Sequence, residues 1–356
     1  MDYKQKLNEL LLTTARENAS DLHIAVGKHP TIRVDSVLIP LTKEAISTKE
    51  DAEGLVLSLL SEEQKKDFAQ LKQIDFSYNF EDKARFRVNV FLQRGFMAAA
   101  LRLIPPQIKT VEDLSLPAIL HDFARLQQGF VLLVGPAGQG KSTTLAAVLD
   151  EINHTRNDHI ITIEDPIEYM FAQDRCIVSQ REVGQDTTSF HDALRAILRQ
   201  DPDVIMIGEM RDSETIATAM TAAETGHVVF STLHTNSASQ TIDRIIDSFP
   251  PEQQGQAISQ LASTLVGIIS QRLIPRLGGG RIPAIEIMIT NPAVKNLIRE
   301  RKVYQIDLVI ETSIQDGMIS LNRSLVELIK KKEVSLEQAE LYSLNPSELR
   351  LLLERS

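Results

Sequence analysis

Residues 129–143 read GFVLLVGPAGQGKST, and this stretch decides the fold class. Its first six residues are almost continuously apolar, which is typical of a strand buried on both faces of a parallel sheet. Gly135, Gly140, Lys141 and Ser142 then match the pattern G-x-x-x-x-G-K-[ST]. A helix is predicted at residues 141–154. A strand, a glycine-rich loop and a helix in this order predict a phosphate-binding loop in an α/β domain, rather than an ordinary glycine-rich turn.

The residue types of this loop suit a bound polyphosphate. Its glycines let the backbone turn with its N–H groups inward, and the helix that follows offers its positive N-terminus. Lys141 can reach the β and γ oxygens, and the Ser142 hydroxyl can ligate Mg²⁺. We expect the nucleotide to contact Gly135, Pro136, Ala137, Gly138, Gln139, Gly140, Lys141, Ser142 and Thr143.

Three more apolar strands are predicted at 159–165, 203–209 and 227–233. Strands that alternate with helices predict a parallel sheet, whose ligands bind at the carboxyl ends of the strands. The strand DPDVIMIGE (201–209) ends in Glu209. Glu209 is therefore a candidate to hold the water shell of Mg²⁺ or to activate water, although a charged residue can also simply end a strand.

Two further segments follow predicted strands. ITIEDPIEY (161–169) carries Glu164, Asp165 and Glu168, and a carboxylate here could orient the attacking water as a general base. A helix cap or a solvated acidic turn is the alternative. TGHVVFSTLHTNSA (225–238) places His234 where a sensor of the γ-phosphate would lie. A structural role for this histidine remains open.

The first hundred residues predict a small α+β unit. We expect helices at 3–17 and about 48–71, and strands at 22–26, 31–35, 74–80, 84–93 and 96–105. Pro105 and Pro106 break this pattern. The predicted organisation is an N-terminal domain at 1–104, a linker at 105–116 and an α/β domain at 117–356 with a helical part from about 290.

Four arginines are candidates to stabilise charge on a transferred phosphoryl group. Arg195 and Arg199 lie four residues apart in a helix predicted at 189–200, so they would share a face. Arg87 and Arg102 lie in the predicted N-terminal sheet. For each of them, a solvated surface position is the alternative.

Composition excludes several classes of protein. The net charge of −10, the aromatic content of 5% and the absence of Trp argue against a nucleic-acid partner. The single cysteine, Cys176, excludes an internal disulfide and a cysteine zinc module. The N-terminus does not have the pattern of a signal peptide, and no stretch is apolar enough to span a bilayer. We expect a cytoplasmic protein.

Taken in order, GPAGQGKS, ITIEDPIEY, DPDVIMIGEMRD and TGHVVFSTLHTNSA resemble the Walker A motif, Asp box, Walker B motif and His box of the secretion ATPase superfamily. The resemblance runs through SDLHI (20–24), RFRVN (85–89) and SQRLIP (270–275). Within the superfamily the chain is most similar to the type IV pilus retraction ATPases. It is short, it lacks the four cysteines of a zinc module, and AVKNLIRE (293–300) is similar to their AIRNLIRE element.

The resemblance implies a RecA-like P-loop motor domain preceded by a small PAS-like α+β domain, both working in a ring of six. It implies ATP and Mg²⁺ as cofactors. Its implied partner is an inner-membrane platform protein of the pilus, through which alone the motor associates with the cytoplasmic face of that membrane.

The resemblance also assigns roles to residues. Glu164 would polarise water, Glu209 would help hold Mg²⁺ and His234 would report the γ-phosphate. Arg87 and Arg102 would reach a nucleotide when the domains close, and the pair Arg195 and Arg199 would belong to the same network.

Three alternatives remain open at this point. A pilus extension or type II secretion ATPase is the alternative within the superfamily. A regulatory switch that binds nucleotide with little turnover belongs to another class, and so does a DNA-dependent ATPase of RecA-like fold.

Overall fold

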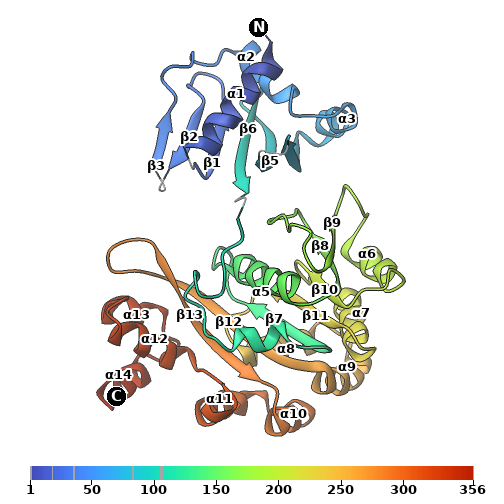
Figure 1. Cartoon of the computed structure of the whole chain (residues 1–356), viewed down its shortest axis with the longest axis vertical. Coiled ribbons are helices and arrows are strands. Elements are labelled where there is room, and N and C mark those ends of the chain that lie inside the picture. Colours follow the sequence, from blue (N-terminus) through green and yellow to red (C-terminus); the bar gives the residue numbers. More distant parts are fainter. Residues whose placement is uncertain (1, 18, 35–36, 82–83, 105–106, 356) are drawn as a thin grey trace. The chain divides into compact units, whose positions relative to one another are not determined.

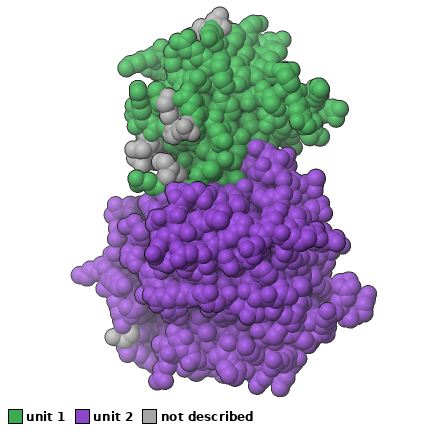
Figure 2. Space-filling view, turned by 45° about the vertical axis from the view of Figure 1, so that its right-hand side comes forward, with its two compact units in different colours: residues 1–107, 166–170 green, residues 108–165, 171–356 purple. Residues whose placement is uncertain are grey.

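The computed structural model describes residues 2–17, 19–34, 37–81, 84–104 and 107–355. They form two compact units, which Figure 2 shows in different colours. The first unit contains residues 1–107 together with 166–170, and the second contains residues 108–165 and 171–356. Each unit is built around its own sheet (Figure 1).

The first unit has a six-stranded antiparallel sheet in the order β3-β2-β1-β6-β5-β4. Its core packs the apolar side of helix α1 against the strands. In β5, Phe86, Val88 and Val90 are buried, as the predicted alternation requires. The elements are α1 (Tyr3–Arg16), β1 (Asp21–Ile24), β2 (Thr31–Val34), β3 (Val37–Pro40), α2 (Lys49–Leu57), α3 (Glu62–Leu71), β4 (Gln73–Phe80), β5 (Ala84–Gln93) and β6 (Phe96–Ile104).

The helical stretch predicted at 48–71 is two helices, so that prediction of a single stretch is wrong. Thr48 caps α2 and Ser61 caps α3, each in a capping box with the residue three positions later. A second capping serine inside the stretch could have revealed the break. The edge strand β3 was not predicted; its four residues are all exposed, so they show no alternation. Residues 35, 105 and 106 of the predicted strand and linker lie outside the described residues.

The second unit has a seven-stranded sheet in the order β13-β12-β7-β11-β10-β8-β9. All neighbours are parallel except the β12–β13 hairpin. This confirms the predicted parallel sheet. Its strands are β7 (Gly129–Val134), β8 (His159–Glu164), β9 (Ile177–Glu182), β10 (Val204–Ile207), β11 (Val228–Leu233), β12 (Leu265–Pro275) and β13 (Arg281–Ile289).

Strand β7 is fully buried, as its apolar sequence predicted. Phe130, Leu132 and Val134 join a core cluster with helices of residues 190–299 on one side of the sheet. Because side chains alternate along a strand, Val131 and Leu133 point to the other side.

The helices of this unit are α4 (Leu120–Ala124), α5 (Lys141–Thr155), α6 (Phe190–Ile197), α7 (Ser213–Glu224), α8 (Ala238–Asp247), α9 (Pro251–Thr264), α10 (Pro292–Arg299), α11 (Ile306–Thr312), α12 (Leu321–Lys330), α13 (Leu336–Tyr342) and α14 (Pro346–Glu354). The predicted helical part from about 290 is therefore confirmed. In the described part of the chain, no helix combines the length and the apolar character that crossing a membrane requires.

Candidate active site

The strand order brings the predicted site residues to one edge of the second sheet. Strands β7, β11, β10 and β8 are direct neighbours, and all four run in parallel. At the carboxyl ends of these four strands lie, in the same order, the loop with Lys141, His234, Glu209 and Glu164. Four motifs that span about a hundred residues of sequence therefore meet along one line, at the position where parallel sheets bind ligands.

The glycine-rich loop of residues 135–142, here called the P-loop, has the geometry of an anion site. Gly138 and Gly140 have φ angles of 73° and 78°, in the region that favours glycine. Gly140 is the N-cap of the fifteen-residue helix α5, and no side chain caps its first N–H groups. Uncapped N–H groups at the positive end of a helix fit a phosphate group.

A buried glutamine holds the P-loop from the neighbouring strand. Gln271 of β12 is only 2% exposed. Its Nε2 donates to the Gln139 carbonyl oxygen at 2.7 Å, and its Oε1 accepts from the Thr144 hydroxyl at 2.7 Å. The Leu273 N–H donates to Gln139 Oε1, also at 2.7 Å. The sequence analysis missed this clamp, although polar residues inside an otherwise apolar strand could have indicated it.

The close packing against Gln271 makes a prediction about Gly135. A Cβ atom at Gly135 would lie 2.4 Å from the Gln271 carbonyl oxygen, and the φ of Gly135 is +144°. We expect Gly135→Ala to lower the free energy of unfolding by about 3 kcal/mol, from backbone strain and overpacking together. The matched control is Gly138→Ala, whose Cβ would meet nothing within 4 Å. Only the positive φ destabilises this variant, and it lowers the free energy of unfolding by about 1 kcal/mol. Thermal unfolding of both variants measures the difference; equal midpoints would contradict it.

Lys141, His234 and Glu209 form a continuous polar line. Lys141 is 7% exposed, and its ammonium donates to the carbonyl oxygens of Gly135 and Pro136 at 2.7 and 3.0 Å. Its Nζ also lies 3.3 Å from His234 Nδ1, and His234 Nε2 lies 3.4 Å from Glu209 Oε1. Because an ammonium can only donate, Nδ1 accepts and the ring proton lies on Nε2, facing the carboxylate.

Glu164 ends strand β8 and is 6% exposed. Its Oε1 accepts hydrogen bonds from the Thr162 hydroxyl at 2.7 Å and from Gln180 Nε2 at 3.2 Å. A carboxylate that is fixed by such hydrogen bonds and largely kept out of bulk water is suited to orient a water molecule. Glu209, by contrast, is paired with the Arg211 guanidinium at 2.9 Å. The two carboxylates therefore have different surroundings, which suits different roles.

Within the first unit, the predicted arginines lie side by side. Arg87 of β5 is directly opposite Arg102 of β6 in the sheet register. Opposite residues on paired strands project to the same face. The Arg102 Nε donates to Asp21 Oδ1 at 3.0 Å, and its side chain is 70% exposed. The sheet thus presents two neighbouring guanidinium groups on one exposed face.

The expected helical pairing of Arg195 and Arg199 is wrong. Helix α6 buries Ala193 and Leu194 as predicted, but it ends at Ile197, so Arg199 lies in the turn beyond it. The i, i+4 spacing therefore does not place the two arginines on one helical face. Both side chains are exposed.

A buried carboxyl group, that of Glu286, contacts the start of helix α8, which follows His234 in the chain. Glu286 of β13 accepts a hydrogen bond from the N–H of Ala238, the first residue of α8, at 2.8 Å. Burial raises the pKa of Glu286 to about 7, although this hydrogen bond and Arg272 oppose the rise. The sequence analysis did not single out Glu286.

The raised pKa of Glu286 predicts how stability depends on pH. The folded protein keeps a proton that the unfolded chain loses above its pKa of 4.5, so stability falls as pH rises from about 4.5 to about 7. Glu286→Gln keeps an oxygen acceptor and never ionises. We expect it to be more stable than the parent by about 3 kcal/mol at pH 8 and equally stable near pH 4. Denaturant unfolding at both pH values is the measurement, and a gain that is the same at both would contradict the assignment.

The comparison with known proteins agrees with these motifs. A model of the family described as "Type II/IV secretion system protein" matches residues 3–281. The chain belongs to this family. It is 46% identical over 333 residues to the "Type IV pilus retractation ATPase PilT" of Pseudomonas aeruginosa, a match that covers 94% of this chain and 96% of the relative. It is 44% identical to a "Twitching motility protein" of Neisseria gonorrhoeae, over 87% of this chain and 83% of the relative.

The comparison with solved structures agrees with the sequence comparison. The chain superposes on the pilus retraction motor PilT with bound ADP at a TM-score of 0.90 and 46% identity, over 98% of this chain and 99% of that one. These matches show a secretion ATPase with α/β sheets. They confirm the prediction that the chain is an ATPase, and the relatives themselves are named for pilus retraction and twitching motility.

Proposed function

We propose that this secretion ATPase hydrolyses ATP at the P-loop edge of its second sheet and uses the energy to drive type IV pilus retraction. The observation that carries the proposal is the polar line from Lys141 through His234 to Glu209. It connects the phosphate-binding loop to the carboxylate expected near Mg²⁺ through a histidine that can respond to the γ-phosphate. A bound phosphate would compete with His234 for the Lys141 ammonium, and the histidine would then reorient.

The residues present suit both groups that the reaction needs. The N–H groups of residues 135–143 would bind the phosphates, with Lys141 on the β and γ oxygens. The Ser142 hydroxyl would ligate Mg²⁺, and Glu209 would hold it through water. When bound, Mg²⁺ neutralises charge that develops on the phosphate oxygens. Glu164 would orient the attacking water and accept its proton.

We further propose that six copies form a ring and that the arginines complete the site. Arg87 and Arg102 would approach a nucleotide as a pair, and their adjacent positions in the sheet support this role. Arg195 and Arg199 would act on the same network, but from a helix and the turn after it. Stabilisation of the transferred phosphoryl group by arginine distinguishes a fast motor from a slow nucleotide switch.

The domain assignment belongs to this proposal. Residues 1–104 would be a PAS-like domain, residues 105–116 a linker and residues 117–356 a RecA-like motor domain. The strand order β2-β1-β6-β5-β4, with helices inserted before β4, supports the first assignment. The partner would be a platform protein of the inner membrane, contacted from the cytoplasmic face, with no nucleic acid involved.

A cell-based experiment tests the direction of the motor. In a piliated host that depends on this protein, Lys141→Ala should give cells with many surface pili and no twitching, because assembly continues without retraction. The parent gene on a plasmid should restore twitching. Cells without pili would contradict retraction and would favour the alternative, a pilus extension or secretion ATPase.

A further inference from the structure

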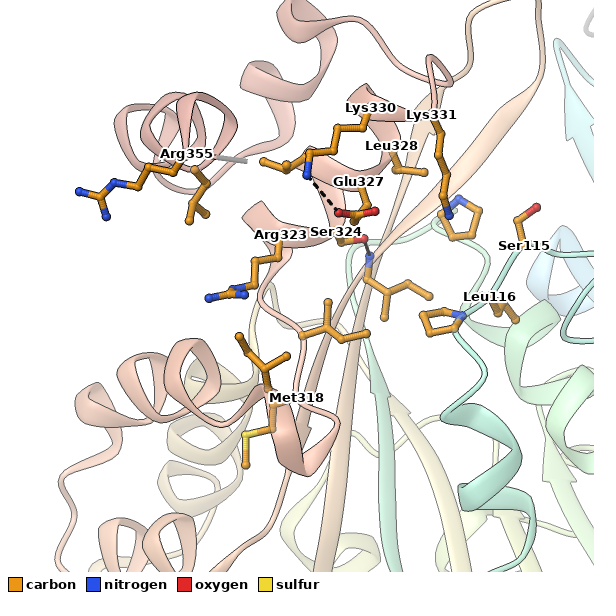
Figure 3. A pocket seen from close by; sticks show the side chains of 17 residues that line it. Ser115, Leu116, Met318, Arg323, Ser324, Glu327, Leu328, Lys330, Lys331 and Arg355 are labelled. Carbon is orange, nitrogen blue, oxygen red and sulfur yellow. Dashed lines mark hydrogen bonds and ion pairs between the residues drawn. The ribbon is translucent and has the colours of Figure 1, made fainter.

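The second unit contains a cavity of about 750 Å³ away from the P-loop. It lies between residues 115–117, strand β13, the loop before α12, helix α12 and the end of α14 (Figure 3). Its lining is largely apolar and includes Pro283, Ile319 and Leu352, which are partly exposed. The volume is within the range of pockets that hold small organic ligands.

The cavity also carries an excess of positive charge. Arg323, Lys330, Lys331 and Arg355 line it, against the single carboxylate of Glu327. Glu327 is paired with Lys330 at 3.7 Å, as Figure 3 shows. Among the described residues, the other three cations form no ion pair, although the charges of Arg323 and Lys331 act on the carboxylates of Glu311 and Glu333. Arg323 donates through Nη2 to the Glu311 carbonyl oxygen, and its buried Nε has no hydrogen-bond partner.

The positive charge of this lining contrasts with the net charge of −10 of the whole chain. Cations that surround one cavity repel each other, and an anion in the cavity would relieve that repulsion. An apolar lining beside unpaired cations fits a ligand with an apolar body and an anionic group.

The wall of the cavity is connected directly to the P-loop clamp. Ile285 of β13 is the register partner of Gln271 of β12, and Pro283, which also lines the cavity, is the partner of Leu273. Gln271 and Leu273 are the two residues that bind Gln139 of the P-loop. On the cavity side, the Ile285 N–H donates to the Ser324 hydroxyl of α12 at 3.0 Å. One strand therefore separates the cavity from the residues that hold the phosphate loop.

We propose that this cavity is a second ligand site, for an amphiphilic anion, and that its occupancy alters nucleotide binding through β13 and β12. An anionic lipid and a soluble organic phosphate share this chemistry. In either case the anionic group would contact a cation of the lining, and the apolar body would lie against the partly exposed Pro283 and Ile319.

The binding test uses the full chain with saturating ADP, so that the P-loop site is filled. The probe is 1-anilinonaphthalene-8-sulfonate, and its uncharged analogue N-phenyl-1-naphthylamine reports purely apolar binding. We expect the double variant Lys331→Glu, Arg355→Glu to bind the sulfonate about tenfold more weakly and the uncharged analogue as before. The control, Lys66→Glu with Lys109→Glu, makes the same charge change at exposed residues outside the cavity and should bind both probes like the parent.

A second set of measurements identifies the source and tests the coupling. Displacement of the sulfonate by phosphatidylglycerol vesicles, but not by phosphatidylcholine vesicles, would identify a lipid. Displacement by dissolved decyl phosphate alone would identify a soluble ligand. Bound decyl phosphate should change the KM for ATP about fivefold in the parent and not in the Lys331→Glu, Arg355→Glu variant, whose basal turnover should be normal.

Two results would overturn the proposal. If the charge-reversed variant binds the sulfonate like the parent, the cavity is an apolar crevice without anion recognition. If decyl phosphate displaces the sulfonate but leaves the KM for ATP unchanged, the site is not coupled to the P-loop. Neither result depends on the direction in which the motor works.

Discussion

Replacing Lys141 with alanine is expected to reduce ATP turnover at least a hundredfold. Lys141 is buried among the P-loop carbonyl groups and His234, so alanine removes the ammonium that these groups hold in place. Loss of one preorganised group that stabilises developing phosphate charge typically costs a factor of about 10² to 10³. Phosphate release at saturating ATP is the measurement.

The control for Lys141→Ala is Lys109→Ala, which removes the same charge from an exposed position of the same unit. It should hydrolyse ATP like the parent. Circular dichroism and thermal unfolding should show that both variants are folded. A Lys141→Ala protein that is folded and retains turnover within tenfold of the parent would show that the P-loop assignment is wrong.

Glu164→Gln is expected to separate nucleotide binding from hydrolysis. The amide keeps the size of the side chain but cannot accept a proton from water, so turnover should fall by a factor of about 10² to 10⁴. ATP affinity, measured by isothermal titration, should change little, because Glu164 ends β8 and is not part of the P-loop. Bound but unhydrolysed ATP should therefore accumulate.

Glu209→Gln is the matched comparison for Glu164→Gln. Glu209 is paired with Arg211 and His234, and it is assigned to Mg²⁺. Its loss should raise the Mg²⁺ concentration needed for half-maximal turnover, an effect that Glu164→Gln should lack. If Glu164→Gln hydrolyses ATP normally while Glu209→Gln is inactive at all Mg²⁺ concentrations, the general base is Glu209.

The sequence predicted the parts of the fold whose local pattern is strong. The apolar run that ends in the P-loop, the alternation in β5 and the helices after residue 290 all agree with the structure. Strand order was not accessible, because it depends on contacts between segments that are far apart in the chain. For this reason the sequence could place His234 after a strand but could not show it between Lys141 and Glu209.

The features that the sequence analysis missed depend on tertiary contacts. Strand β12 carries Ser270, Gln271 and Arg272 in a row, and these polar residues obscure the apolar strand pattern. Ser270 and Gln271 are tolerated because each has a hydrogen-bond partner. Ser270 donates to the Asn236 carbonyl oxygen after His234, and Gln271 donates to the Gln139 carbonyl oxygen of the P-loop. The end of α6 at Ile197 was also missed; the turn leads to Asp201, which has a positive φ and is followed by Pro202.

The most direct test of the motor account is ATP turnover per subunit as a function of protein concentration, with the mass determined by light scattering in the same samples. The account predicts that turnover rises as a species of six subunits appears, because neighbouring subunits complete the site with their arginines. Turnover that is independent of concentration in a monomeric protein would contradict it. The arginines would then act within one chain or not at all, and the chain would resemble a nucleotide switch.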